Sequence, residues 1–157
     1  MTVDEIVAEL TARFEGLAPK ASWGETSLFY NPGAQLANGI YFVTIKEDDG
    51  ENDKASRLGR EGVFRVSFGL AGDAYQRMFG AKPGRPAKGG VVEVGGEFDF
   101  AGVGELMPHP IYAWMGWVQI LSPSRAEFDA LLPLLDDSYA AAKVKFARAV
   151  GGRGGVK

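Results

Sequence analysis

The segment PHPIYAWMGWV, residues 108–118, holds the side chains with the clearest chemical potential in this sequence. The chain's only histidine, His109, lies between two prolines that keep its backbone extended. Tyr112, Trp114 and Trp117 follow within the next eight residues. An imidazole and a phenol beside two indoles could orient and stack a ligand, which predicts an aromatic-walled pocket. The alternative interpretation is a buried aromatic cluster with a surface histidine capping it.

A single arginine, Arg65, interrupts the otherwise apolar strand pattern GVFRVSFGL at residues 62–70. Alternation places its side chain on the face opposite the apolar stripe. A guanidinium at that position could form a structural ion pair with Glu93 or Glu97. It could instead point into a concavity and bind a carboxylate or phosphate through two parallel hydrogen bonds.

The polar segment EDDGENDKASRLGREG, residues 47–62, is long for a connection inside a compact domain. A loop that folds over one end of the sheet would explain this length. Such a loop would carry several polar side chains toward the mouth of the pocket. We expect these to be Asp53, Lys54, Ser56 and Arg60.

No metal, cofactor or catalytic site is predicted. The acidic run DDGEND fails the calcium-loop pattern, because Gly50 as the invariant glycine would place Ile45 at the first ligand position. The chain has no cysteine and no G-x-S-x-G motif. A general acid–base role for the single histidine would need a partner that the sequence does not identify. Catalysis is therefore not indicated.

A basic segment at residues 74–92 contains Arg77, Lys82, Arg85 and Lys88 and no acidic residue. Its loop GAKPGRPAKGG lacks the lysine-serine or lysine-threonine pair of a phosphate-binding P-loop. The segment is either a solvated basic loop or a contact for an anion or a nucleic acid. The net charge of −3 argues against an extensive nucleic-acid footprint.

Periodicity predicts the elements that must position these side chains. Apolar residues at helical spacing follow two capping boxes, Thr2–Glu5 and Ser124–Glu127. The second of these helices contains Pro133, so we expect a kink or two abutting helices. Strands are predicted at residues 26–30, 39–46, 62–70 and 117–121, with a short helix at 74–79 and a weak hairpin at 91–100.

This order predicts an α+β fold: an antiparallel sheet with an N-terminal helix, a short central helix and a long kinked C-terminal helix packed on one face. Residues 1–149 would form a single globular domain and residues 150–157 a flexible tail. The sequence shows no signal-peptide pattern and no apolar run of membrane-spanning length. We therefore expect a cytoplasmic protein without a membrane partner, either a monomer or a weak homodimer.

Three groups of residues resemble the MmcQ/YjbR-like family, small bacterial domains with a CyaY-like α+β fold. They are YFVTIK with FRVSFG before a short helix, the aromatic segment HPIYAWMGWV, and DDSYAAAKVKF in the last helix. The resemblance implies the same fold and the DNA-binding role proposed for that family. The family has a His-Trp pair where this sequence has Gly116 and Trp117, so a role of that pair does not carry over to His109.

Other segments look like a longer bacterial family of unknown function, namely FVTIKEDDGENDKAS, REGVFR, MFGAKPGRPAKG and PHPIYAWMGWV. The function predicted from the residues is non-catalytic binding of a small anionic or aromatic ligand on the uncovered sheet face. The predicted ligand contacts are Lys54, Arg60, Arg65, His109, Tyr112, Trp114 and Trp117. The alternative is a nucleic-acid-binding or protein-interaction module that uses the basic loop 77–88 and the C-terminal helix.

Overall fold

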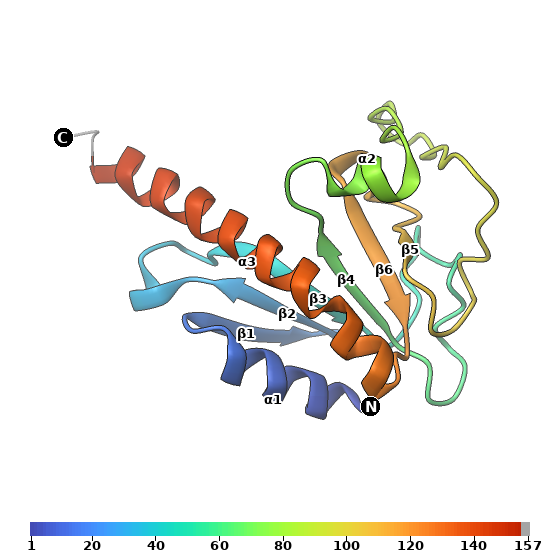
Figure 1. The fold of residues 1–157 in the computed structure, drawn as a ribbon, viewed down its shortest axis with the longest axis horizontal. Coiled ribbons are helices and arrows are strands. Elements are labelled where there is room, and N and C mark those ends of the chain that lie inside the picture. Colours follow the sequence, from blue (N-terminus) through green and yellow to red (C-terminus); the bar gives the residue numbers. More distant parts are fainter. Residues whose placement is uncertain (155–157) are drawn as a thin grey trace.

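An antiparallel sheet with helices packed against it forms the framework of the computed structural model, which describes residues 1–154 (Figure 1). The elements in chain order are α1 (Val3–Arg13), β1 (Leu17–Ser22), β2 (Glu25–Tyr30), the 3-10 turn η1 (Pro32–Ala34), β3 (Ile40–Lys46), β4 (Arg65–Gly69), α2 (Ala74–Phe79), β5 (Met107–Pro108), the 3-10 turn η2 (Ala113–Met115), β6 (Trp117–Leu121) and α3 (Arg125–Gly154). The sheet order is β1-β2-β3-β4-β6-β5, and every neighbouring pair is antiparallel. The predicted α+β class is confirmed.

Both predicted capping boxes are present. The Thr2 hydroxyl accepts a hydrogen bond from the Glu5 amide at 3.2 Å, and the Glu5 carboxylate accepts one from the Thr2 amide at 3.0 Å. At the start of α3, the same exchange joins Ser124 and Glu127 at 3.1 and 2.8 Å. These local contacts satisfy amides that have no partner within the helix, so they fix where each helix begins.

Pro133 lies inside α3 without dividing it. The structure has one continuous helix from Arg125 to Gly154, so the expectation of two abutting helices is wrong. Pro133 is on the exposed side of the helix, where water can hydrate the carbonyl that its missing amide leaves without a partner. The helix also extends into the predicted tail, and residues 155–157 lie outside the described residues.

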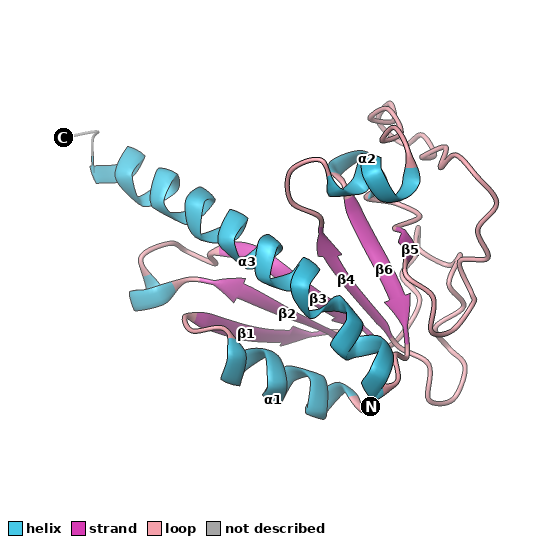
Figure 2. Ribbon diagram, in the orientation of Figure 1, coloured by secondary structure: helices cyan, strands magenta, loops and turns pink. Residues whose placement is uncertain are grey.

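The hydrophobic core lies between one face of the sheet and the helices α1 and α3, which cover that face (Figure 2). The ring of Tyr139 from α3 packs against Phe14 of α1 and Phe42 of β3, with centroids 4.7 and 5.7 Å away. The Tyr139 hydroxyl donates to the Glu15 carbonyl at 2.6 Å. Each layer thus contributes an aromatic ring to a shared cluster, and this fixes α3 across the sheet.

The second face of the sheet is divided into two halves. In the covered half, formed by β4, β5 and β6, the long loop segments around residues 53–58 and 99–101 lie over the strands. In the open half, formed by β1, β2 and β3, Tyr41 is 58% exposed. Alternation predicted one apolar face for β4, but Arg65 through Phe68 are all buried because loops cover the face opposite the helices.

Two elements differ from the prediction at the margins of the sheet. β1 was not predicted, since its sequence LAPKAS contains few residues that favour strands. It forms because a tight turn after Ser22 places it beside β2. It is an edge strand with an exposed Pro19 and an exposed Lys20. The hairpin predicted at 91–100 does not form; this glycine-rich segment contains no strand.

None of the helices described within residues 1–154 combines the length and the apolar character needed to cross a membrane.

Candidate functional site

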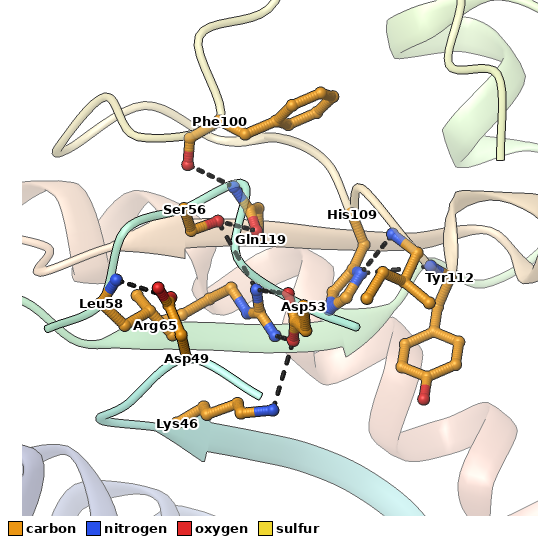
Figure 3. Close-up of polar contacts among 11 residues, drawn as sticks. Lys46, Asp49, Asp53, Ser56, Leu58, Arg65, Phe100, His109, Tyr112 and Gln119 are labelled. Carbon is orange, nitrogen blue, oxygen red and sulfur yellow. Dashed lines mark hydrogen bonds and ion pairs between the residues drawn. The ribbon is translucent and has the colours of Figure 1, made fainter. Parts of the chain in front are cut away.

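An ion pair between Arg65 and Asp53 lies at the centre of the covered half. The Arg65 Nη1 atom is 2.8 Å from Asp53 Oδ1, and its Nη2 atom contacts the other carboxylate oxygen (Figure 3). Lys46 Nζ lies 3.3 Å from the same carboxylate. The partner of Arg65 is therefore Asp53, not Glu93 or Glu97, because the loop 47–62 folds back over β4.

One hydroxyl side chain, Ser56, and one amide side chain, Gln119, extend this contact network across the strands. Ser56 donates its hydroxyl hydrogen to Gln119 Oε1 at 3.1 Å, and the Gln119 amide nitrogen donates to the Phe100 carbonyl at 3.1 Å. Ser56 and Gln119 are both completely buried. We call Lys46, Asp53, Ser56, Arg65, His109 and Gln119 the buried cluster; Lys46, at its rim, is partly exposed. Its hydrogen bonds fasten two loops to the sheet.

Opposing effects set the ionisation of Asp53. Burial raises the pKa of this carboxyl, but the hydrogen bonds and charge of Arg65, together with the Lys46 charge, outweigh it and hold the pKa below its usual range. Among the described residues, Arg65 Nε is the one buried side-chain nitrogen or oxygen without a hydrogen-bond partner. Asp53 therefore provides most of the compensation for the buried guanidinium.

His109 is buried, with 2% of its surface exposed, and is not the surface histidine that was considered. Its Nδ1 atom accepts hydrogen bonds from the amides of Ile111 and Tyr112 at 3.0 and 3.1 Å, so a neutral ring carries its hydrogen on Nε2. Burial and the nearby Arg65 charge lower the pKa of His109 to about 3, against an opposite effect of Asp53. The imidazole thus positions the turn that presents Tyr112.

A hollow of about 600 Å³ opens between three loop segments beside the buried cluster. We call it the loop hollow. Its lining includes Asp53, Lys54, Lys88, Tyr112 and Trp114. The guanidinium of Arg85 lies 5.0 Å from the centroid of the Trp114 ring and supports one side of the hollow from outside the lining.

A second, smaller hollow of about 220 Å³ lies on the sheet beside the first. We call it the strand hollow, and its lining consists of Glu25, Tyr41, Thr44, Tyr112, Met115 and Trp117. Tyr112 lines both hollows, which otherwise differ in composition.

The single pocket predicted from the sequence is therefore divided between three places. Trp114 and Lys54 line the loop hollow, Trp117 lines the strand hollow, and Tyr112 contributes to both. Arg65 and His109 lie beneath the surface and line neither hollow. Their contribution is to hold the loop and the turn that carry the lining residues.

Arg60 is hydrogen-bonded to the backbone and does not line either hollow. Its guanidinium donates to the carbonyl oxygens of Arg57, Ser56 and Ala101 at 2.8, 3.0 and 2.8 Å. These three bonds close the loop 47–62 and join it to the segment near residue 101. Arg60 thus belongs to the support of the site, although the sequence placed it among the ligand contacts.

The four cations of the basic segment have different neighbours. Arg77 of α2 forms an exposed ion pair with Asp73, the residue that precedes this helix, at 3.3 Å. Lys82 lies beside the turn that ends η2, Arg85 covers Trp114, and Lys88 lines the loop hollow. Of these four cations, Lys88 lines the loop hollow together with Tyr112 and Trp114, two of the predicted ligand contacts.

Sequence reasoning missed Glu25 and Tyr41 as candidate site residues. Both lie in strands whose neighbours depend on the register of β2 against β3, which contains a bulge after Leu28. The exposure of Tyr41 in β3 is a property of the folded chain, so the sequence offered no signal for it. Its significance appears only once Trp117 is placed two strands away.

Two of the acidic loop residues, Asp49 and Asp53, have structural partners. Asp49 accepts a hydrogen bond from the Leu58 amide at 2.9 Å, and Asp53 pairs with Arg65. Within residues 1–154, no group of three or more histidine, aspartate or glutamate side chains is arranged to hold a metal ion.

The comparison with protein families places the chain in a family of unknown function. Residues 1–151 match the family of unknown function DUF6194, so the chain belongs to it. A search of curated proteins and a search of solved structures found no significant match.

Proposed function

We propose that this member of a family of unknown function binds a small anionic ligand with a flat ring in the loop hollow, without catalysing a reaction. The observation that carries the proposal is the placement of Lys54, Lys88 and Trp114 around one cavity of about 600 Å³. Cavities of this size accommodate metabolite-sized ligands, and a few polar groups among apolar ones fix the orientation of such ligands.

The charge of the lining favours an anion. Lys54 and Lys88 contribute two positive charges, and Asp53 is the one acidic residue in the lining. The negative charge of Asp53 is compensated from beneath by Arg65 and Lys46. A ligand carboxylate or phosphate would therefore meet a positive local field.

The indole of Trp114 supports a ring in the ligand. Arg85 lies over this indole, so its guanidinium is a cationic neighbour of the stacking surface. Aromatic rings stack in offset geometry, and a flat ligand ring beside Trp114 would add apolar contact to the charge pairing. Arg65 and His109 are assigned a supporting role, not the direct ligand contact expected from the sequence.

Adenosine monophosphate, adenosine and inorganic phosphate form a set of probes that separates the two halves of the proposal. Titrations followed by tryptophan fluorescence should show that the nucleotide binds more tightly than either fragment. Lys88→Ala should weaken nucleotide binding about fivefold, since one partly solvated charge contact contributes up to about 1 kcal/mol. Lys143→Ala, at a lysine that lies over Tyr139 instead, is the matched control and should leave binding unchanged.

If Lys88→Ala left the affinity for the nucleotide unchanged, the loop hollow would not be the binding site. Binding of a DNA oligonucleotide that falls steeply with salt would instead favour the nucleic-acid alternative, with Arg77, Lys82, Arg85 and Lys88 as its contacts. The relation to the MmcQ/YjbR-like family remains a proposal based on the residues that resemble it.

A further inference from the structure

We infer that the strand hollow is a second binding site, and that it takes a methylated ammonium group such as the head group of choline. The site lies between β2 and β3 of the open half and the start of β6, and it does not depend on the ligand proposed for the loop hollow. The volume of the hollow is small, about 220 Å³, which suits a compact head group better than a whole metabolite.

Three aromatic rings from separate parts of the chain line this hollow. Tyr41 comes from β3, Trp117 from β6 and Tyr112 from the turn between β5 and β6. Tyr41 and Tyr112 are 58% and 45% exposed, so their rings are available to a ligand from solvent. Aromatic faces attract a cation through their negative quadrupole, and several rings around one cavity favour a cation whose charge is spread over methyl groups.

The position of Trp117 depends on a glycine in the neighbouring strand. Gly69 pairs with Trp117 across β4 and β6, and a Cβ atom at residue 69 would lie 3.1 Å from the indole nitrogen. The absence of a side chain at Gly69 allows the indole to lie close against the β4 backbone. The ring is therefore held at the edge of the hollow next to the sheet.

Glu25 supplies the negative charge, and it is the one charged side chain in the lining. Its cross-strand neighbour is Lys46, which would be its natural ion-pair partner. The Lys46 ammonium group is instead 3.3 Å from Asp53, in the buried cluster. No ion pair of Glu25 occurs within the part of the chain that the structure describes, so its carboxylate can face a cationic ligand.

The two hollows therefore differ in the charge that they favour. The loop hollow contains two lysines, whereas the strand hollow combines one carboxylate with three aromatic rings, a methionine and a threonine. A neutral apolar group could use the same rings, but it would gain nothing from Glu25. A comparison between a quaternary ammonium ion and its neutral isostere tests this distinction directly.

Choline, tetramethylammonium and the neutral isostere 3,3-dimethylbutan-1-ol are the probes, titrated into the full chain. Binding can be followed by NMR through the indole N–H signals, which are assigned to the three tryptophans by substitution. We expect roughly tenfold tighter binding of choline than of the isostere, because only the cation gains from the rings and the carboxylate. The Trp117 signal should shift, and the exposed Trp23 signal should not.

Glu25→Gln and Tyr41→Leu should each weaken choline binding about fivefold while the chain stays folded, with a small loss of stability for Tyr41→Leu because Tyr41 packs against Phe29. Trp114→Leu, in the loop hollow, is the matched aromatic control and should leave choline binding unchanged. Because Lys88→Ala acts on the loop hollow alone, loss of nucleotide binding and loss of choline binding can be told apart.

Equal binding of choline and the isostere, or choline binding that survives both Glu25→Gln and Tyr41→Leu, would overturn the proposal. A peptide that carries trimethyllysine distinguishes the two sources of the same group. Tighter binding of this peptide than of choline would assign the ammonium group to a protein partner, and weaker binding would assign it to a free small molecule.

Discussion

The covered half and the open half of the second sheet face use their polar and aromatic residues in opposite ways. In the covered half, Arg65 is 3% exposed and pairs with Asp53 beneath a loop. In the open half, Tyr41 is 58% exposed and lies beside a small hollow. A charge under a loop contributes to the structure, whereas an aromatic ring without a cover is available for contact. The path of the loops decides between these roles.

The largest effect should come from breaking the ion pair in the covered half. Asp53→Ala would leave a buried guanidinium without its counter-charge, which typically costs about 3–5 kcal/mol in the free energy of unfolding. Urea unfolding followed by circular dichroism measures this loss. Asp136→Ala is the matched control, since Asp136 forms a similar pair with Arg13 in which both side chains are nearly half exposed.

If Asp53→Ala lowered the free energy of unfolding no more than Asp136→Ala does, the buried pair would not hold the loop. Replacing both partners of the buried pair with apolar residues of similar volume should recover most of the lost stability, because the uncompensated charge disappears with its partner.

The next effect is the pH dependence of stability in the covered half. Burial and Arg65 lower the pKa of His109 to about 3, below the value near 6.5 of an unfolded chain. The unfolded state therefore binds more protons, and the stability present above pH 6.5 is lost as the pH falls toward 3. The loss should approach about 1.4 kcal/mol per pH unit.

The window between pH 5.5 and pH 6.5 reports this residue most directly. His109 is the only histidine, and the acidic groups whose pKa is lowered, such as Asp53 and Glu9, have ordinary values of 3.8 and 4.5, so they affect stability mainly at lower pH. Urea unfolding at several pH values should show a slope in this window that His109→Gln removes. A slope that persists in this variant would mean that another group titrates there.

The smallest effect should be in the open half. Trp23, at the turn between β1 and β2, is 98% exposed, so Trp23→Ser should change the free energy of unfolding by less than about 0.5 kcal/mol. Leu58 lies in the loop over the covered half and is completely buried. Leu58→Ala should lower the free energy of unfolding by about 2–5 kcal/mol. Similar losses for Trp23→Ser and Leu58→Ala would contradict the difference between the two halves.

The parts of the fold that depend on neighbouring residues were predictable from the sequence. The capping boxes at Thr2 and Ser124, the strand around Arg65 and the short helix at 74–79 follow from local hydrogen bonds and periodicity. β1 escaped prediction because its residues do not favour a strand, and only its pairing with β2 stabilises it.

The site was less predictable because it depends on the path of two long loops. The residue types around His109 and Arg65 indicated polar chemistry, but not which groups would be buried. The partner of Arg65 comes from a loop that crosses the sheet, and the strand hollow joins Tyr41 to Trp117 across an intervening strand. Neither relation leaves a signal at fixed sequence spacing.

The outermost strand, β1, has a consequence for how these chains behave at high concentration. Pro19 offers no amide hydrogen to a neighbouring molecule, and Lys20 beside it repels a second copy of the same edge. Extension of the sheet by a strand from another copy is therefore disfavoured at this edge.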